Sequence, residues 1–122
     1  MKILIVDDSR FTQLTMAKLL KSYIEDLEIF FASDGEDGFN KYKELNPDYV
    51  FVDLLMPIVS GQELVKLIKK YDTNSKIFVV SADVQKNVKK EIESYGIMKF
   101  INKPFTEEKA ELVTKIIKGD TR

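Results

Sequence analysis

Three carboxylates, one hydroxyl and one ammonium group of this 122-residue chain stand at the ends of short apolar runs. Asp7 and Asp8 follow the first run, Asp53 ends the third, Ser81 follows the fourth and Lys103 follows the fifth. Neighbouring carboxylates repel one another, and an oxygen-only site favours Mg²⁺ or Mn²⁺ as the neutralising ion. The lysine and the hydroxyl suit phosphoryl oxygens. The set therefore predicts phosphoryl transfer, with a carboxylate as the covalent acceptor.

Each of these residues also has a commoner structural explanation. The acidic pair before Ser9 could cap a helix and complement its dipole. Asp53 could end a strand, Ser81 could be a turn hydroxyl, and Lys103 could be a solvated side chain before Pro104. Asp53, however, lies in an apolar stretch where an unpaired carboxylate is costly. The structural explanations would also have to bring all these groups to one place in the fold by accident.

The composition excludes several other chemistries. The chain has no Cys and no His, which removes disulfides, zinc–thiolate sites, Ser-His-Asp triads and a histidine phosphocarrier. The net charge is −1, from 19 basic and 20 acidic residues, and gives no long-range attraction to nucleic acid. No stretch approaches the roughly 20 apolar residues that span a bilayer, and the first apolar run is too short for a signal peptide. We therefore expect a cytoplasmic protein without a membrane or nucleic-acid partner.

Short apolar runs alternate with amphipathic stretches along the whole chain. The runs are rich in β-branched and aromatic residues and predict strands at 3–6, 29–32, 49–52, 77–80 and 98–101. Between them, apolar residues recur every three or four positions, as in helices that cover one face of a sheet: Phe11, Leu14, Leu20 and Ile24; Phe39, Tyr42 and Leu45; Leu64, Leu67, Ile68 and Tyr71; Val84, Val88, Ile92 and Tyr95; Val113, Ile116 and Ile117. This alternation predicts a single α/β domain with a parallel sheet, helices on both faces, and a ligand site at the carboxyl ends of the strands.

Six short motifs occur along the chain: Val6-Asp7-Asp8-Ser9, Asp34-Gly35-Glu36, Asp53-Leu54-Leu55-Met56-Pro57, Gly61-Gln62-Glu63-Leu64, Ser81-Ala82 and Lys103-Pro104-Phe105. In their order and spacing they resemble the receiver domains of response regulators, the phosphoacceptor modules of two-component signalling. The resemblance runs from residue 3 to about residue 117. It implies a flavodoxin-like, doubly wound five-stranded parallel sheet of order 2-1-3-4-5 with five helices. It also implies a receiver domain at 1–118 and a short tail at 119–122.

The resemblance implies a role for each candidate residue. Asp53 is expected to be the nucleophile that becomes an aspartyl phosphate. Asp8 and Asp53, with the backbone carbonyl of Leu55, are expected to ligate Mg²⁺, and Asp7 to hold it largely through a water. Lys103 is expected to pair with Asp53 at rest and with a phosphoryl oxygen after modification.

Further positions of the family pattern concern the response to phosphorylation. Ser81 is expected to bind a phosphoryl oxygen and so sense the modification, and Phe100 occupies the position of the switch aromatic residue. The Lys103–Pro104 peptide bond is expected to be cis. Leu55 and Asp83 lie where the family tunes the lifetime of the phosphoryl group. Apolar Leu55 cannot orient a water molecule, whereas Asp83 could.

The expected function is that of a phosphorylation-activated response regulator. The phosphoryl group is expected to come from a sensor histidine kinase or a histidine phosphotransfer protein. The signal is expected to pass to a downstream protein by altered docking of the face formed by the fourth helix, fifth strand and fifth helix, in a monomer or a weak phosphorylation-dependent dimer. The charged residues of that face are either read by the partner or simply solvated: Lys86, Lys89, Lys90 and Glu93. The chain is not expected to be an enzyme beyond its own phosphorylation and dephosphorylation.

Other functions remain open on the sequence. A small Mg²⁺-dependent phosphohydrolase with an aspartyl nucleophile is one, although its usual Asp-x-Asp pattern is replaced here by an adjacent pair. An intermediate in a phosphorelay is another. A degenerate receiver that only scaffolds would have lost an acid or the lysine, and none is missing. A stand-alone, chemotaxis-type receiver is expected, with a fragment of a longer regulator as the alternative.

Overall fold

The computed structural model describes residues 1–82 and 84–120 and contains one parallel sheet. Its strands are β1 (Lys2–Val6), β2 (Glu28–Ala32), β3 (Tyr49–Val52), β4 (Ile77–Ser81) and β5 (Lys99–Asn102). Their order in the sheet is β2-β1-β3-β4-β5, which confirms the predicted topology. Connections therefore run in opposite directions from β1 and β3. In open α/β sheets such a switch point opens a crevice at the carboxyl ends of the strands.

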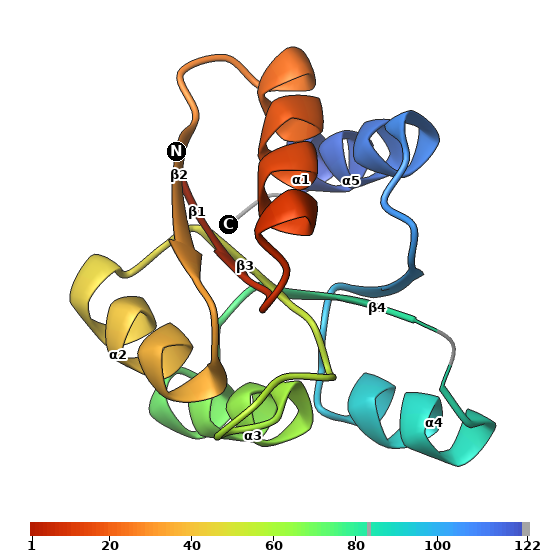
Figure 1. Cartoon of the computed structure of the whole chain (residues 1–122). Helices are drawn as coiled ribbons and strands as arrows, with labels where there is room; N and C mark the ends of the chain where they lie inside the picture. Colours follow the sequence, from red (N-terminus) through yellow and green to blue (C-terminus); the bar gives the residue numbers. More distant parts are fainter. Residues whose placement is uncertain (83, 121–122) are drawn as a thin grey trace.

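Within the part of the chain that the structure describes, five helices cover the two faces of the sheet. They are α1 (Arg10–Tyr23), α2 (Gly35–Leu45), α3 (Gly61–Tyr71), α4 (Lys86–Ser94) and α5 (Glu107–Gly119). Helices α1 and α5 lie together on one face, while α2, α3 and α4 cover the other (Figure 1). Among the described residues, none of the helices combines the length and apolarity needed to cross a membrane.

The core forms two layers, one on each side of the sheet. On the α1 and α5 side, the rings of Phe51 and Phe78 stack with their centroids 4.9 Å apart. On the α2–α4 side, Val52 packs in one cluster with Leu64 and Ile68. Every residue of β3 and β4 is buried. This explains why these two runs are apolar without alternation, since helices cover both of their faces.

Side-chain caps fix where four of the helices begin. The side chains of Ser9, Asp34, Ser60 and Thr106 each accept a hydrogen bond from a backbone N–H of the first turn. Helix α4 begins after Gln85 without such a bond, and its one buried residue is Ile92. Of the described helices, α4 therefore buries the fewest residues.

The inward face of α1 differs from the prediction. Phe11 is 80% exposed and Leu14 is 49% exposed, so their assignment to the sheet-facing side was wrong. The buried residues of α1 are Gln13, Met16, Ala17 and Leu20, which follow one another at helical spacing. The residue types predicted the wrong face of α1 as buried, because the face that is in fact buried begins with a polar glutamine.

The boundaries of α4 and α5 also differ from the sequence pattern. Val84 precedes α4 and Tyr95 is its C-cap, although both pack against the same core layer as Ile92. Helix α5 runs through Gly119, one residue beyond the expected domain end at 118. Asp120 is fixed as well, because it accepts a hydrogen bond from Tyr49 Oη at 2.6 Å and pairs with Lys76.

The corrected phase of α1 predicts unequal effects of two leucine truncations. We expect Leu20→Ala to lower the free energy of unfolding by about 2–5 kcal/mol, because it leaves a cavity in the core. We expect Leu14→Ala to change it by less than about 0.5 kcal/mol. Urea unfolding followed by circular dichroism measures both. Equal losses would show that the helix presents a different face to the sheet.

Candidate functional site

Backbone hydrogen bonds at the carboxyl edge of the sheet place the predicted residues side by side. The Asp53 N–H donates to Val6 O at 3.0 Å, and the Lys103 N–H donates to Ser81 O at 2.8 Å. Asp7 N–H donates in the same way to the last residue of β2. Each bond continues the parallel ladder by one residue beyond a strand end. The first residues after β1, β3 and β5 therefore emerge at the same edge, next to the last residue of β4, Ser81.

The side chains meet around one lysine. Lys103 Nζ lies 3.0 Å from Asp7 Oδ2 and 3.3 Å from Asp53 Oδ2. Ser81 Oγ donates a hydrogen bond to the other oxygen, Asp53 Oδ1, at 3.1 Å. The two oxygens of Asp53 thus face an ammonium group and a hydroxyl. The expected Lys103–Asp53 pair is present, and Asp7 shares the same lysine.

Burial sets the electrostatics of this group. Asp7 and Asp53 are only 2% and 5% exposed, whereas Asp8 is exposed. Burial raises the pKa of Asp7, and this is opposed by the hydrogen bond from Ser9 N–H and by Lys103. Partial burial works against the charge of Lys103, but the hydrogen bonds and charges of the two buried aspartates outweigh it and raise the lysine pKa. The lysine is therefore a fixed positive charge at neutral pH.

The three carboxylates fit a hard divalent cation. Asp7, Asp8 and Asp53 each offer one oxygen, and these oxygens lie within 4.8 Å of one another. Such an oxygen-only donor set suits Mg²⁺, which keeps several waters and binds beside phosphates. Leu55 is 65% exposed at the same edge, and its N–H lies 3.4 Å from Asp53 Oδ1.

Comparison with known families identifies this arrangement. A family model described as the response regulator receiver domain matches residues 3–117, a range that contains every residue placed above. The chain belongs to this family. It is thus a receiver homologous to those of chemotaxis-type two-component signalling.

Several relatives share most of the receiver's length. The chemotaxis protein CheY of Thermotoga maritima is 35% identical over 118 residues, which cover 96% of this chain and 98% of that protein. Protein CcdB of Bacillus subtilis is 33% identical over 119 residues, covering 95% and 97%. The protein-glutamate methylesterase/protein-glutamine glutaminase 3 of Geobacter sulfurreducens is 31% identical over 113 residues, but the match covers only 30% of its length.

A solved structure relates the fold to a metal-containing complex. The CheX-CheY-BeF₃-Mg²⁺ complex of Borrelia burgdorferi contains a chain that matches this receiver with a TM-score of 0.87 and 31% identity. The match covers 98% of this chain and 90% of that one. The Mg²⁺ and beryllofluoride belong to that complex.

Two glycines allow close approach around the loop that follows Asp53. A Cβ atom on Gly61 would lie 1.9 Å from the backbone oxygen of Asp53. A Cβ atom on Gly35 would lie 2.2 Å from the backbone oxygen of Val59, in the same loop. The starts of α3 and α2 can therefore pack against the acceptor loop only because neither residue has a side chain.

Sequence reasoning missed one residue of the site's support. Gln13 is 1% exposed, and its Nε2 donates to Asp7 O at 2.6 Å and to Ala32 O at 3.1 Å. The available signal was its spacing, since Gln13 stands three and seven positions before buried Met16 and Leu20. A polar residue on an inward helical face must find hydrogen-bond partners.

The other predicted positions have different outcomes. Phe100 is 7% exposed, and its ring packs into the core layer on the α2–α4 side. The Lys103–Pro104 peptide bond is cis, as expected. Asp83 lies outside the described residues. The carbonyl of Leu55 stays a predicted metal ligand, because its place at the site edge does not test that role.

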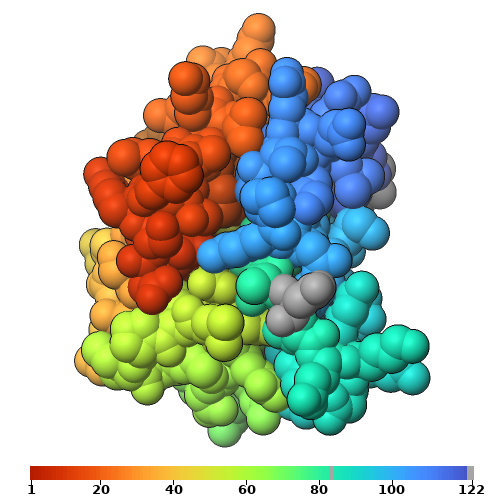
Figure 2. All heavy atoms as spheres, turned by 45° about the vertical axis from the view of Figure 1, so that its right-hand side comes forward, coloured from red at the N-terminus to blue at the C-terminus, as the bar shows by residue number. Residues whose placement is uncertain are grey.

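Two hollows in the described part of the chain lie at different distances from the acidic cluster, one beside it and one at the opposite ends of the strands. A groove of about 340 Å³ between α1 and the β5–α5 connection is lined by Phe11, Met16, Lys103 and Phe105, among others, and so lies beside the site lysine. In Figure 2 the segments near residue 10, residues 53–60 and residues 100–110 meet on one face of the molecule.

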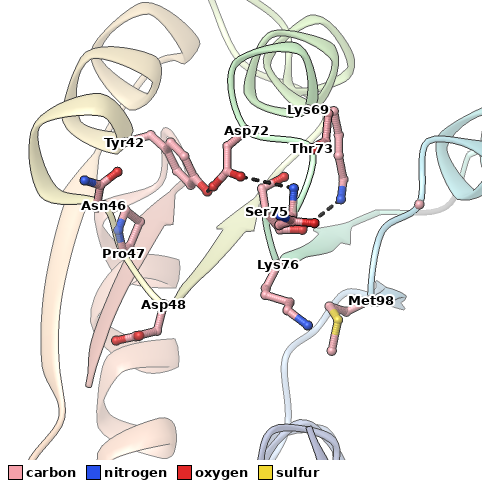
Figure 3. Close-up of a pocket in the computed structure, with 12 residues that line it drawn as sticks. Tyr42, Asn46, Pro47, Asp48, Lys69, Asp72, Thr73, Ser75, Lys76 and Met98 are labelled. Atoms are coloured by element: carbon pink, nitrogen blue, oxygen red, sulfur yellow. Dashed lines mark hydrogen bonds between the residues drawn. The ribbon is translucent and has the colours of Figure 1, made fainter. Parts of the chain in front are cut away.

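The larger hollow, of about 710 Å³, lies at the opposite ends of the strands (Figure 3). Its polar groups bind one another, since Tyr42 Oη donates to Asp72 at 3.0 Å and Lys69 Nζ to Ser75 O at 2.8 Å. None of the candidate site residues lines it. Size alone therefore does not identify the functional site of this receiver.

The burial of Asp7 predicts that a neutral isostere stabilises the metal-free receiver. We expect Asp7→Asn to raise the free energy of unfolding by about 1 kcal/mol in EDTA, because it removes a charge that burial penalises and keeps the acceptor for Ser9 N–H. The stabilisation that Mg²⁺ gives should shrink in the same variant. Urea unfolding in EDTA and in Mg²⁺ measures both effects.

Glu44→Gln is the control, because it neutralises an exposed carboxylate on α2, outside the cluster. It should leave both the metal-free stability and the gain from Mg²⁺ unchanged. A loss of metal-free stability in Asp7→Asn would mean that the ion pair with Lys103 outweighs the burial of the aspartate.

Proposed function

We propose that Asp53 accepts the phosphoryl group of this receiver from a phosphohistidine on a partner protein. The supporting observation is its placement, with one carboxylate oxygen facing Lys103 and the other facing Ser81. Asp7 and Asp8 add carboxylate oxygens within 4.8 Å. Receiver domains of this type are generally non-enzymatic signalling domains. The chemistry is accordingly confined to the receiver's own aspartate.

In the transfer step, a carboxylate oxygen of Asp53 attacks the phosphorus atom. The bond from phosphorus to the imidazole nitrogen of the donor breaks, and its electron pair stays on that nitrogen. Lys103 Nζ already lies 3.3 Å from the acceptor carboxylate, so it can offset the charge of a phosphoryl oxygen. Ser81 Oγ can donate to another. Asp7, Asp8 and Asp53 would hold Mg²⁺ beside this group, and the ion would supply further positive charge for the phosphoryl oxygens.

Phosphorylation by a small donor tests the acceptor. With Mg²⁺ and acetyl phosphate, we expect intact-mass spectrometry to show one labile phosphoryl adduct on the wild-type chain. Asp53→Asn should abolish the adduct, because an amide is a poor nucleophile and loses the negative charge. Lys103→Met should slow its formation by about 10²-fold or more, since it removes a charge aimed at the phosphoryl oxygens.

Glu63→Gln is the matched control, because it neutralises an exposed carboxylate in the first turn of α3. It should be phosphorylated like the wild type. An adduct that persists in Asp53→Asn would refute the assignment of the acceptor. Rapid multiple turnover of unrelated phosphomonoesters would instead indicate a phosphohydrolase.

We further propose that Ser81 and Phe100 transmit the modification to the surface of α4, β5 and α5. Ser81 Oγ bonds to the acceptor carboxylate in this structure, and Phe100 is packed inward next to β4. When a phosphoryl group attracts the Ser81 hydroxyl, the side chain moves and leaves space at the end of β4. The Phe100 ring can fill this space. Lys89 Nζ of α4 lies 5.5 Å from the centre of that ring, so a movement of the Phe100 ring would be felt by α4. Helix α4, which has no side-chain cap, can respond to this change.

We therefore expect the Ser81 hydroxyl to matter more for the movement of Phe100 than for formation of the phosphoryl adduct on Asp53. With Mg²⁺ and beryllofluoride, a phosphoryl mimic, the NMR resonances of Phe100 should shift in the wild type. We expect a much smaller shift in Ser81→Ala, which cannot donate to the mimic, and a retained shift in Ser81→Thr. Equal shifts in all three proteins would remove Ser81 from the pathway.

A further inference from the structure

The buried carboxamide of Gln13 lies beside the acidic cluster and makes three hydrogen bonds, but it has no part in the proposed transfer step. Its Nε2 donates to Asp7 O at 2.6 Å and to Ala32 O at 3.1 Å. Its Oε1 accepts a hydrogen bond from Arg10 Nη1 at 3.1 Å. The side chain is 1% exposed, so each of these bonds replaces water that cannot reach it.

These partners fix which way the amide points. Two carbonyl oxygens face one end, and a guanidinium faces the other, so exchanging nitrogen and oxygen would oppose like with like at all three contacts. Arg10 is itself held in place, with its guanidinium carbon 5.1 Å from the centre of the Phe31 ring. The amide is therefore locked between α1 and the ends of two strands.

The carbonyl that Gln13 holds belongs to the peptide unit joining Asp7 to Asp8. Restraining this unit restrains both Cα atoms, and hence the directions in which the two carboxylates leave the backbone. The same turn is tied by Asp7 Oδ1, which accepts from Ser9 N–H at 2.8 Å. Ala32 O accepts from Asp7 N–H as well as from Gln13, so one carbonyl of β2 anchors the whole turn.

We propose that Gln13 is a positioning residue, whose carboxamide preorganises the Asp7–Asp8 turn for the binding of a divalent cation. This inference rests on the proposed function, because it concerns the same carboxylates. Without the two hydrogen bonds, the turn samples other orientations, and binding the cation must then restrict it. Residues that orient metal ligands through hydrogen bonds typically change metal affinity by about 10–100-fold when they are removed.

The test is the affinity of the unphosphorylated chain for Mg²⁺, measured by NMR titration. Gln13→Met keeps the size of the side chain and removes both donors, and we expect it to raise the dissociation constant about tenfold. The control is Leu20→Val, a buried truncation two turns along the same helix that does not touch the acidic turn. It should lower the melting temperature and leave the dissociation constant unchanged.

Each result decides the inference. A dissociation constant that changes no more in Gln13→Met than in Leu20→Val overturns the positioning role. If Gln13→Met does not fold, Arg10→Ala is tested instead, since Arg10 is exposed. This variant removes the hydrogen bond to Gln13 Oε1 and so frees the amide. Loss of the positive charge alone would tighten Mg²⁺ binding. Weaker binding in Arg10→Ala then supports the role, and equal or tighter binding overturns it. A wild-type chain that binds no Mg²⁺ would contradict the proposed function itself.

Discussion

Two buried aspartates share the positive charge of Lys103, and this burial of charge governs the properties of the site. Asp7 and Asp53 are almost fully removed from water, a costly position for carboxylates unless a positive charge accompanies them. One ammonium group, within 3.3 Å of both, supplies that charge. The pairing leaves an excess of negative charge at the edge of the sheet, because exposed Asp8 belongs to the same cluster. A divalent cation would offset that remaining charge and could also contact the oxygens of a phosphoryl group, which is why burial and function coincide here.

The fold serves this pairing by bringing distant parts of the chain to one edge. The strand order places β1, β3, β4 and β5 next to one another, although the residues they deliver lie as far apart as Asp7 and Lys103. Gly61 allows α3 to begin against the backbone of Asp53, and Gln13 ties the acidic turn to β2. By contrast, α4 has neither a side-chain cap nor more than one buried residue. Close packing and hydrogen bonds thus hold the acceptor edge, whereas α4, on the surface that we propose carries the signal, buries a single residue.

Most of the fold and the composition of the site follow from the sequence for identifiable reasons. Apolar runs such as 49–52 are long enough to predict buried parallel strands, and parallel strands necessarily direct Asp53 and Ser81 to the same edge. The sequence does not determine which face α1 turns toward the sheet, or which side chains share a hydrogen-bonding or ion-pair partner. Phe11 looks like a core residue and is exposed, because the phase of α1 is set by Gln13, Met16 and Leu20. That Lys103 pairs with Asp7 as well as with Asp53, and that Gln13 supports the turn, depends on side-chain directions that no motif specifies.

Locating the phosphoryl group chemically in the wild-type chain tests most directly whether Asp53 is the acceptor. Borohydride reduces an acyl phosphate to an alcohol and so converts a phosphorylated aspartate into homoserine, which peptide mass spectrometry can place in the sequence. After treatment with Mg²⁺ and acetyl phosphate, we expect homoserine at position 53 and at no other aspartate. Homoserine at position 7 or 8, or a phosphoryl group that resists borohydride because it is carried by a hydroxyl, would contradict it.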